Sequence, residues 1–348
     1  MNLPKLRFKE FTDSYKKMKY KDVLKIKSGK DQKRIECKNG KYPILGTGGK
    51  IGTTNMFLYN KPSVLIGRKG TINKPQYMET PFWTVDTLFY SQIYKPNIPK
   101  YLFYSFQNVN WQKYDESTGV PSLSSSTIES VECFIPSIDE QIKVSNFLSL
   151  LDKKIELQTK KIEALKLFKK GLISKLLNEY NYEIMKIKDV LKFEQPTKYI
   201  VNSDDYINDS KAIPVLTANK AFILGYCNEN NVYDKGDSII FDDFTMDMKY
   251  TNFNYKIKSS AIKILTAKDN NDLRFLYELL LSLNLKNEEH KRHYISIVQE
   301  MNVKIPSIEV QNSISSKLEL IDNKILFEEK FLDNLTKLKK GFMQNMFV

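Results

Sequence analysis

A long stretch of the chain occurs twice, and this duplication limits the possible folds more than any other feature. Residues 135–171 read IPSIDEQIKVSNFLSLLDKKIELQTKKIEALKLFKKG, and residues 305–341 read IPSIEVQNSISSKLELIDNKILFEEKFLDNLTKLKKG. The offset in residue number is the same at both ends, since 305 − 135 and 341 − 171 both give 170. Each copy follows a segment of mixed composition. The sequence therefore predicts a tandem duplication in which a globular segment and a long helix alternate.

Both copies place apolar residues in steps of three and four, which is the spacing of a coiled-coil seam. The predicted seam consists of Val144, Leu148, Leu151, Ile155, Ile162 and Leu165, and of Ile314, Leu318, Ile321, Ile325, Leu332 and Leu335. One seam position in each copy is polar, Gln158 in the first and Glu328 in the second. A polar seam residue typically fixes the register of the two helices. Pro136 and Pro306 suit the start of each helix.

The connections between the segments predict how the two helices pair. A helix from Asp139 to Asn178 would be roughly 60 Å long, whereas a globule of about 110 residues is only roughly 30 Å across. The second globule joins the end of the first helix to the start of the second, so an antiparallel pair brings its attachment points together. We expect an antiparallel coiled coil with a globule at each end, related by a pseudo-two-fold axis. The predicted domains are a globule at 1–138, a helix at 139–180, a globule at 181–308 and a helix at 309–348.

Each globule is expected to mix strands and helices, so the fold class is α/β of the α+β type. Buried strands are predicted at 64–66 and 238–241, and further strands at 83–93 and 260–265. Amphipathic helices are predicted at 100–107 and 272–283, and the glycines at 46, 48, 49 and 52 mark a tight loop. Shorter phrases also repeat, at offsets of 167, 171 and 175, as loop insertions between two copies would produce.

The formal net charge of +13 favours a polyanionic partner such as nucleic acid, although lysine-rich composition also accompanies AT-rich genomes. Cys37, Cys133 and Cys227 are far apart and odd in number, which gives neither a disulfide framework nor zinc spacing. The chain has no apolar run of about 18 residues, and its N-terminus lacks the apolar core of a secretory signal. We therefore expect a cytoplasmic protein with no membrane contact.

Several phrases together resemble the specificity subunits of type I restriction–modification systems over nearly the whole chain. The two repeated helical stretches resemble that family's two conserved regions. GTGGKIGTTNMF, SVLIGRKGTIN and FWTVDTLFY resemble one type of target-recognition domain, and VLTANKAFILGY and IIFDDFT resemble another. The resemblance implies that each globule reads one part of a bipartite, asymmetric site in double-stranded DNA. It also implies two modification subunits docked on the helices, joined by restriction subunits. S-adenosylmethionine, ATP and Mg²⁺ would belong to those partners, and no cofactor or metal is expected in this chain.

The candidate DNA contacts are donor-rich loops beside predicted strands, where arginine can read guanine and lysine can hold phosphate. In the first globule they are Arg68, Lys69, Gly70, Thr71, Asn73, Lys74, Ser117 and Thr118. In the second they are Thr217, Asn219, Lys220, Lys249, Tyr250, Asn252, Lys291, Arg292 and His293. The alternative for these loops is an ordinary solvated turn. Asp242 and Asp243 stand where Arg68 and Lys69 stand in the repeat, and a capped turn is favoured there over a metal site with Asp247.

Two other functional classes compete with DNA recognition. A coiled-coil adaptor would join proteins without contacting DNA, and the salt dependence of DNA affinity discriminates between the two. A nuclease would pair Asp22 or Asp31 with Glu36 and Lys38, an arrangement that chance readily produces in a lysine-rich chain. The sequence contains no methyltransferase motif, so we expect a non-enzymatic subunit. His290 and His293 lie three positions apart without further ligands nearby, so a zinc site is not expected.

Overall fold

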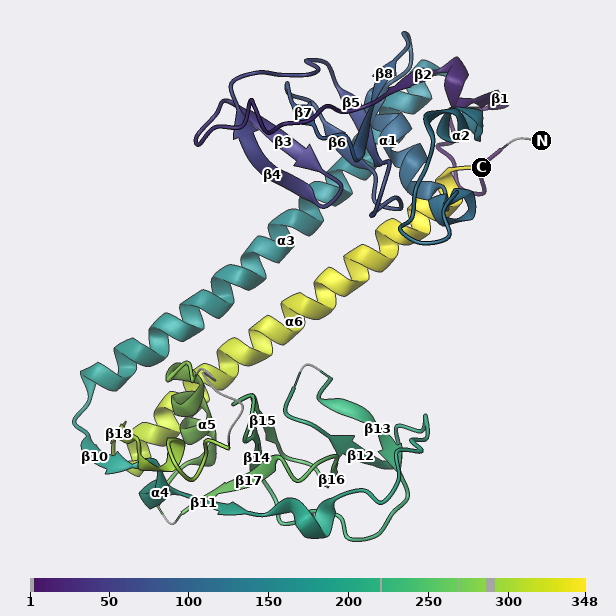
Figure 1. Cartoon of the computed structure of the whole chain (residues 1–348). Helices are drawn as coiled ribbons and strands as arrows, with labels where there is room; N and C mark the ends of the chain where they lie inside the picture. Colours follow the sequence, from purple (N-terminus) through teal and green to yellow (C-terminus); the bar gives the residue numbers. More distant parts are fainter. Residues whose placement is uncertain (1–2, 220, 269, 286–291) are drawn as a thin grey trace. The chain divides into compact units, whose positions relative to one another are not determined.

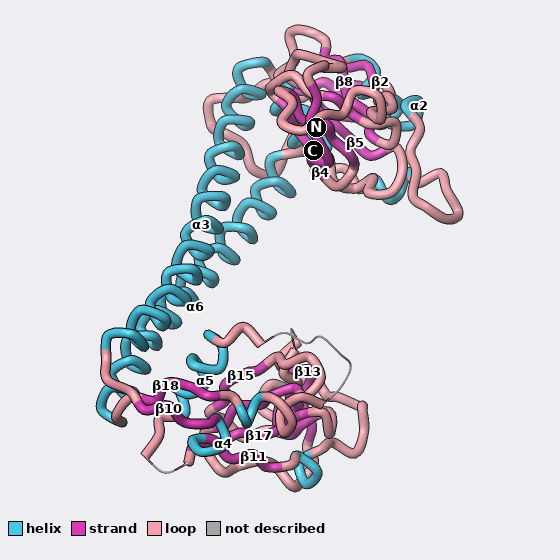
Figure 2. Tube along the Cα trace, turned by 60° about the vertical axis from the view of Figure 1, so that its left-hand side comes forward, coloured by secondary structure: helices cyan, strands magenta, loops and turns pink. Residues whose placement is uncertain are grey.

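The computed structural model describes residues 3–219, 221–268, 270–285 and 292–348, and the chain divides into two compact units. Unit 1 contains Met1–Thr159 and Lys330–Val348, and unit 2 contains Lys160–Glu329. The sequence predicts four segments, in which each long helix is separate from the globules. The two compact units instead each contain a globule together with about half of each long helix. Figure 1 labels the elements, and Figure 2 distinguishes helices, strands and loops.

In its described residues, unit 1 combines three small sheets with short helices. One sheet pairs β1 (Lys16–Lys19) with β9 (Glu132–Ile135) in antiparallel fashion. An antiparallel sheet has the order β2 (Leu24–Lys27), β8 (Leu88–Ile93), β5 (Ser63–Gly67) and β6 (Gln76–Met78). The third has the order β4 (Gly49–Thr54), β3 (Tyr42–Gly46) and β7 (Trp83–Thr84), with β3 and β7 parallel. The helical elements are η1 (Tyr20–Asp22), α1 (Pro99–Asn108), η2 (Trp111–Tyr114) and α2 (Ser125–Ser130).

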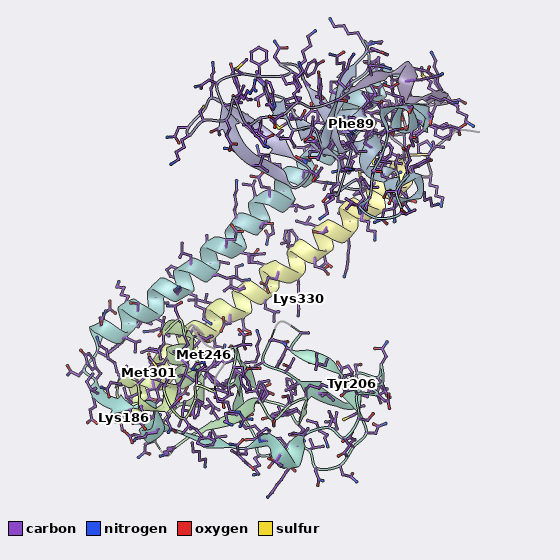
Figure 3. All side chains as sticks on the ribbon, viewed as in Figure 1. Phe89, Lys186, Tyr206, Met246, Met301 and Lys330 are labelled. Atoms are coloured by element: carbon purple, nitrogen blue, oxygen red, sulfur yellow. The ribbon has the colours of Figure 1, made fainter. Side chains whose placement is uncertain are left out.

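Unit 2, as far as it is described, repeats these sheets in the same order. β10 (Glu183–Lys186) pairs with β18 (Asn302–Ile305), and Lys186 and Met301 in Figure 3 mark this junction. The larger sheet has the order β11 (Leu191–Glu194), β17 (Ile262–Ala267), β14 (Ser238–Asp242) and β15 (Met248–Thr251). The smaller has the order β13 (Ile223–Cys227), β12 (Ile213–Leu216) and β16 (Lys256–Ile257), with β12 and β16 parallel. The helical elements are α4 (Ile187–Val190), η3 (Pro196–Tyr199), α5 (Leu273–Ser282) and η4 (Val298–Glu300).

The expected mixed fold and its duplication are confirmed, but the strand predicted at 83–93 is wrong as one element. The chain leaves β7 after Thr84 and starts β8 at Leu88, because β7 pairs with β3 whereas β8 joins β2 and β5 in another sheet. Unit 2 makes the same change of sheet between β16 and β17. The strand-forming residues on both sides of Asp86 do not reveal such a change, since both strands are largely buried.

The long helices are α3 (Ile138–Glu179) and α6 (Ile308–Met346), and their contacts run antiparallel within each unit. In unit 1, Phe147 contacts Phe342 and Asp152 pairs with Lys339. In unit 2, Lys161 pairs with Glu328 and Lys169 pairs with Asp322. The residue numbers on one helix rise as those on the other fall, as we expected. All twelve predicted seam residues are buried or half-buried. Their detailed coiled-coil packing stays a prediction.

The polar seam residues are buried as well. Gln158 is 8% exposed, and Glu328 is 2% exposed. The Glu328 carboxylate lies 2.8 Å from the ammonium groups of both Lys161 and Lys324. A buried carboxylate needs such partners, because an unpaired buried charge is costly. The register-fixing role of these two residues stays a prediction.

A buried glutamine joins each long helix to the globular part of its unit. In unit 1, the Gln141 side chain accepts the Ile98 N–H at 2.9 Å and donates to the Pro136 carbonyl at 3.1 Å. In unit 2, Gln311 accepts the Asp272 N–H at 2.9 Å and donates to the Pro306 carbonyl at 2.9 Å. The two glutamines are related by the same offset as the long helices, so the repeat preserves side-chain contacts as well as sheet order.

Candidate nucleic-acid interface

The loop that follows β5 presents two cations at the surface of unit 1. Arg68 donates its backbone N–H to the Thr87 carbonyl at 2.8 Å, which holds the start of the loop against the turn before β8. Gly70 has a φ of +86°, a conformation that favours glycine. The Arg68 and Lys69 side chains are exposed, and neither forms an ion pair with the described residues. Both are therefore available to a ligand.

A second loop, residues 115–124, holds the predicted contacts Ser117 and Thr118 and lies directly against the first. Leu123 donates its N–H to the Arg68 carbonyl at 2.9 Å, and Gly70 donates to the Pro121 carbonyl at 2.8 Å. The Asp115 carboxylate accepts from the backbone N–H groups of Ser122 and Ser117, and these bonds lower the pKa of Asp115. The structure thus brings the loop that holds Ser117 and Thr118 beside the Arg68 loop, as a site shared by both loops would require.

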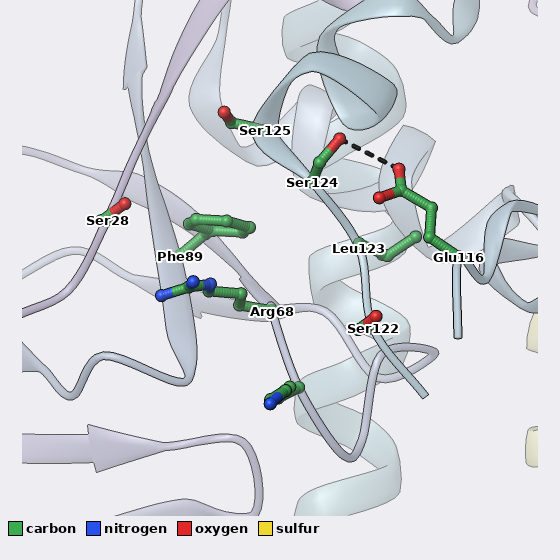
Figure 4. A pocket seen from close by; sticks show the side chains of 9 residues that line it. Ser28, Arg68, Phe89, Glu116, Ser122, Leu123, Ser124 and Ser125 are labelled. Atoms are coloured by element: carbon green, nitrogen blue, oxygen red, sulfur yellow. Dashed lines mark hydrogen bonds between the residues drawn. The ribbon is translucent and has the colours of Figure 1, made fainter. Parts of the chain in front are cut away.

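The two loops border an open depression of about 400 Å³, shown in Figure 4. Arg68, Lys69, Ser122, Ser124 and Ser125 contribute cationic and hydroxyl groups to its lining. Glu116 also lines it, but its carboxylate accepts hydrogen bonds from Thr127 and Ser124, which lower its pKa. This mixture of cations and hydroxyl donors suits phosphate and base-edge acceptors.

The depression also contains residues that sequence reasoning did not select as contacts. Ser28 reaches it from the segment after β2, and nothing in the sequence connects this residue with a loop forty positions downstream. Ser122, Ser124 and Ser125 also line it and are not among the predicted contacts. Gly70, Thr71, Asn73 and Lys74 continue the Arg68 loop away from the lining, and Asn73 and Lys74 are exposed.

Charge is distributed very unequally between the two units. From Leu24 to Met78, the stretch from β2 to β6 contains 12 basic and 2 acidic residues, a net charge of +10. From Leu191 to Thr251, the equivalent stretch from β11 to β15 contains 6 basic and 10 acidic residues, a net charge of −4. Most of the net charge of +13 therefore lies in one part of unit 1.

The acidic loop of unit 2 is held by its own carboxylates. Asp242 accepts the N–H groups of Phe244 and Thr245, each at 2.9 Å, which is the capped turn that the sequence favoured. Asp243 is 1% exposed and lies 3.3 Å from the equally buried Lys263 ammonium. Among the described residues, no group of three or more His, Cys, Asp or Glu side chains could hold a metal ion.

The loop contact of unit 1 recurs in unit 2 with different side chains. His293 donates its N–H to the Asp243 carbonyl at 3.1 Å, as Leu123 does to the Arg68 carbonyl. His293 is 5% exposed, so the predicted contact residue takes the buried place of Leu123 and does not present its ring at the surface. Arg292 beside it is exposed, with its guanidinium 5.8 Å from the Phe244 ring. Lys291 lies outside the described residues.

The remaining predicted contacts of unit 2 lie on two elements. Thr217 is largely buried and Asn219 is exposed, both in the turn between β12 and β13, whereas Lys220 lies outside the described residues. Lys249 and Tyr250 are on β15 and are half-buried, and Asn252 follows them in an exposed position. The Tyr250 hydroxyl donates to Asp237, and the Arg274 guanidinium lies 5.0 Å from the Tyr250 ring. Burial and the Asp237 carboxylate raise the pKa of Tyr250, so the phenol stays neutral.

Comparison with known proteins identifies the family to which this duplicated architecture belongs. The sequence model of the family described as "Type I restriction modification DNA specificity domain" matches residues 12–167 and again residues 179–337. The chain belongs to this family. The two matches coincide with the two repeats, so each repeat is one specificity domain.

Individual relatives of this specificity-domain protein support the same assignment. The Escherichia coli type I restriction enzyme EcoR124I/EcoR124II specificity subunit is 43% identical over 141 residues, which are 38% of this chain and 35% of that protein. The chain thus spans about a third of that relative. The Methanocaldococcus jannaschii MjaVIII specificity subunit is 24% identical over 289 residues, covering 70% of this chain and 68% of that protein.

A solved structure shares the fold over the whole chain. The S subunit of a type I restriction–modification system from M. genitalium matches with a TM-score of 0.71 and 16% identity, covering 99% of each chain. At this identity the similarity shows the fold alone. No helix in the described part of this specificity-domain protein combines the length and apolarity that a bilayer crossing requires.

Proposed function

We propose that this chain is the DNA-recognition subunit of a type I restriction–modification complex, and that unit 1 and unit 2 each read one half of a bipartite site. The observation that carries this proposal is the double match to the DNA specificity domain, combined with loops that occupy equivalent places but differ in chemistry. The equivalent loop contacts show that Asp243 of unit 2 stands where Arg68 stands in unit 1, and Phe244 where Lys69 stands, one position away from the pairing expected from the sequence. Two readers with different loops would recognise two different half-sites.

The chemistry available in unit 1 suits contacts to both phosphates and bases. Lys69 can neutralise a phosphate, and Arg68 can donate two hydrogen bonds to guanine O6 and N7. The hydroxyl groups of Ser122, Ser124 and Ser125 add donors and acceptors at the same depression. Among the described predicted contacts of unit 2, Asn219, Arg292 and Asn252 are exposed. The buried His293 would support the Asp243 loop instead of touching DNA.

The long helices offer two equivalent surfaces for partners. Leu150 and Leu157 on α3 are 68% and 56% exposed, and their counterparts Leu320 and Phe327 on α6 are 71% and 62% exposed. Both pairs are related by the offset that relates the two helices. Exposed apolar residues that recur in this way suit two copies of one partner. We assign these surfaces to two modification subunits, with restriction subunits joining the assembly.

Catalysis is assigned to the partner subunits. S-adenosylmethionine would supply the methyl group, and ATP with Mg²⁺ would drive restriction, in those subunits. This chain would bind and position the DNA for them.

A competition assay tests the proposal. The chain would be purified with its modification subunits, after a methylation map of host DNA with and without the gene had identified the bipartite site. We expect a duplex with this site to compete at least 100-fold better than a random duplex of equal length, within the usual range of specific over non-specific binding. Equal competition by the two duplexes would refute the proposal.

A further inference from the structure

Unit 1 contains a second basic groove, separate from the depression beside Arg68. This groove has a volume of about 610 Å³ and lies between three segments of unit 1. The segments are residues 73–75 after the Arg68 loop, residues 107–110 at the end of α1, and residues 336–344 of α6. The buried Met343 forms part of its lining, and polar side chains supply most of the rest.

Five polar side chains of the groove have no partner among the described residues, whereas Lys339, which also lines it, pairs with Asp152. Lys74, Asn108, Asn110, Lys340 and Gln344 are exposed, and their side chains form no hydrogen bond or ion pair with the described residues. No lining residue is acidic. Two ammonium groups and three amide groups thus line one hollow that has no carboxylate in its lining. Such a set favours an anion that brings oxygen acceptors.

Unit 2 contains the position equivalent to this groove, and there an internal hydrogen bond occupies the lysine. Ile98 donates its N–H to Gln141 in unit 1, and Asp272 donates its N–H to Gln311 in unit 2. Ile98 and Asp272 are therefore equivalent, and the residue numbers around them differ by 174 between the two units. By this offset Asn110 corresponds to Asn284, and by the helix offset of 170 Lys340 corresponds to Lys170.

In unit 2 the two counterparts bind each other, since the Lys170 ammonium donates to the Asn284 side-chain oxygen at 2.8 Å. Lys340 and Asn110 line the groove in unit 1 without this bond. Only in unit 1, among the described residues, is this lysine–asparagine pair open to a ligand.

We propose that this groove binds a phosphate of the DNA backbone flanking the half-site read by unit 1. The inference rests on the proposed function and extends it to a contact that carries no sequence information. The groove continues the Arg68 loop through Asn73 and Lys74, so one strand can pass from the loop to the groove. Lys340 and Lys74 would neutralise the phosphate, and the amide groups of Asn108 and Asn110 would donate to its oxygens.

The test is a Lys340→Gln variant of the full chain, purified with its modification subunits. Removing one phosphate contact lowers the slope of log K against log salt by about 0.9. The affinity gap between wild type and variant should therefore narrow by about 3.5-fold between 50 and 200 mM salt. Because phosphate contacts are independent of sequence, bipartite and random duplexes should weaken by the same factor.

Lys337→Gln is the matched control, since Lys337 is a 72% exposed lysine on the same helix that does not line the groove. We expect this control to keep the wild-type slope. A set of duplexes with single neutral methylphosphonate linkages gives a second measurement. One linkage beside the first half-site should weaken wild type and leave Lys340→Gln unaffected.

The outcomes separate this proposal from the proposed function. If wild type does not prefer the bipartite duplex, the proposed function fails. If wild type prefers it and Lys340→Gln matches Lys337→Gln in slope and linkage sensitivity, the groove proposal is overturned. It is overturned as well if Lys340→Gln keeps its DNA affinity but loses the modification subunit, because the groove would then be a protein interface.

Discussion

Replacement of Gln311 by alanine should loosen unit 2 while leaving unit 1 intact. Gln311 is 1% exposed, and its side chain joins the Asp272 N–H to the Pro306 carbonyl. Besides a long bond to the Asn271 side chain at 3.3 Å, the variant loses these two hydrogen bonds to the backbone, worth about 0.5–1.5 kcal/mol each, and leaves a buried backbone donor or acceptor without its partner, at about 1–3 kcal/mol. We therefore expect a loss of about 2–6 kcal/mol in the local stability of the α5 start.

Hydrogen exchange followed by mass spectrometry measures this loss where it occurs. A stability change of about 2 kcal/mol corresponds to roughly a 30-fold faster exchange of the amides that open together. Peptides from α5 and β18 should accelerate in Gln311→Ala, whereas peptides from α1 should not change. Gln141→Ala should show the reverse pattern, because Gln141 makes the equivalent bonds in unit 1.

Ser313→Ala is the control, because Ser313 is an exposed residue two positions along the same helix. It should leave exchange in both units unchanged. The reasoning is refuted if Gln311→Ala matches this control, or if it accelerates α1 as much as α5. Either result would mean that the glutamine does not join the helix to its own globule.

Other contacts of the chain lead to three more predictions. Arg68→Ala combined with Lys69→Ala should lower the salt slope of DNA binding by about 1.8 if both side chains contact phosphates, whereas an unchanged slope in a fluorescence titration would exclude both contacts. Gln158→Leu combined with Glu328→Leu should preserve helix content but loosen the register, since Glu328 would lose its ion pairs with Lys161 and Lys324; unchanged crosslinks between α3 and α6 would count against register fixing. Burial raises the pKa of Cys133 to about 12, so its thiol stays protonated and should resist alkylation from pH 7 to 9, when thiolate forms at ordinary cysteines; modification of Cys133 as fast as the half-buried Cys37 would contradict this.

The repeat and the apolar periodicity predicted most of the architecture. The duplicated apolar seam predicts two long helices of the same kind, which are α3 and α6. The short apolar runs at Val64–Ile66 and Ser238–Phe241 lie in the buried strands β5 and β14. The change of sheet at Val85–Thr87 could not be predicted, because strand pairing depends on distant partners. β7 adds to β3 some forty positions upstream, and the local sequence carries no sign of it.

The candidate interface was predictable in its loops but not in its individual side chains. The apolar run of β5 is buried along its whole length, and the polar residues that follow it, Arg68 and Lys69, form an exposed loop. The sequence shows this boundary directly. His293 looked like a surface residue between basic neighbours, but its N–H bonds to Asp243 draw it into the interior. Such long-range backbone contacts decide which residue of a polar run is buried. Composition cannot show them.

One backbone contact explains how the two units keep the same loop arrangement while their side chains diverge. Leu123 bonds to the Arg68 carbonyl in unit 1, and His293 bonds to the Asp243 carbonyl in unit 2. Because the bond joins an N–H to a carbonyl, it does not depend on whether the accepting residue is arginine or aspartate. The side chain at this position can therefore differ while the two loops stay together: Arg68 of unit 1 is exposed, whereas Asp243 of unit 2 is buried and accepts the N–H groups of His293 and Tyr294. A duplicated scaffold can thus present two different surfaces, which is what recognition of two unequal half-sites requires.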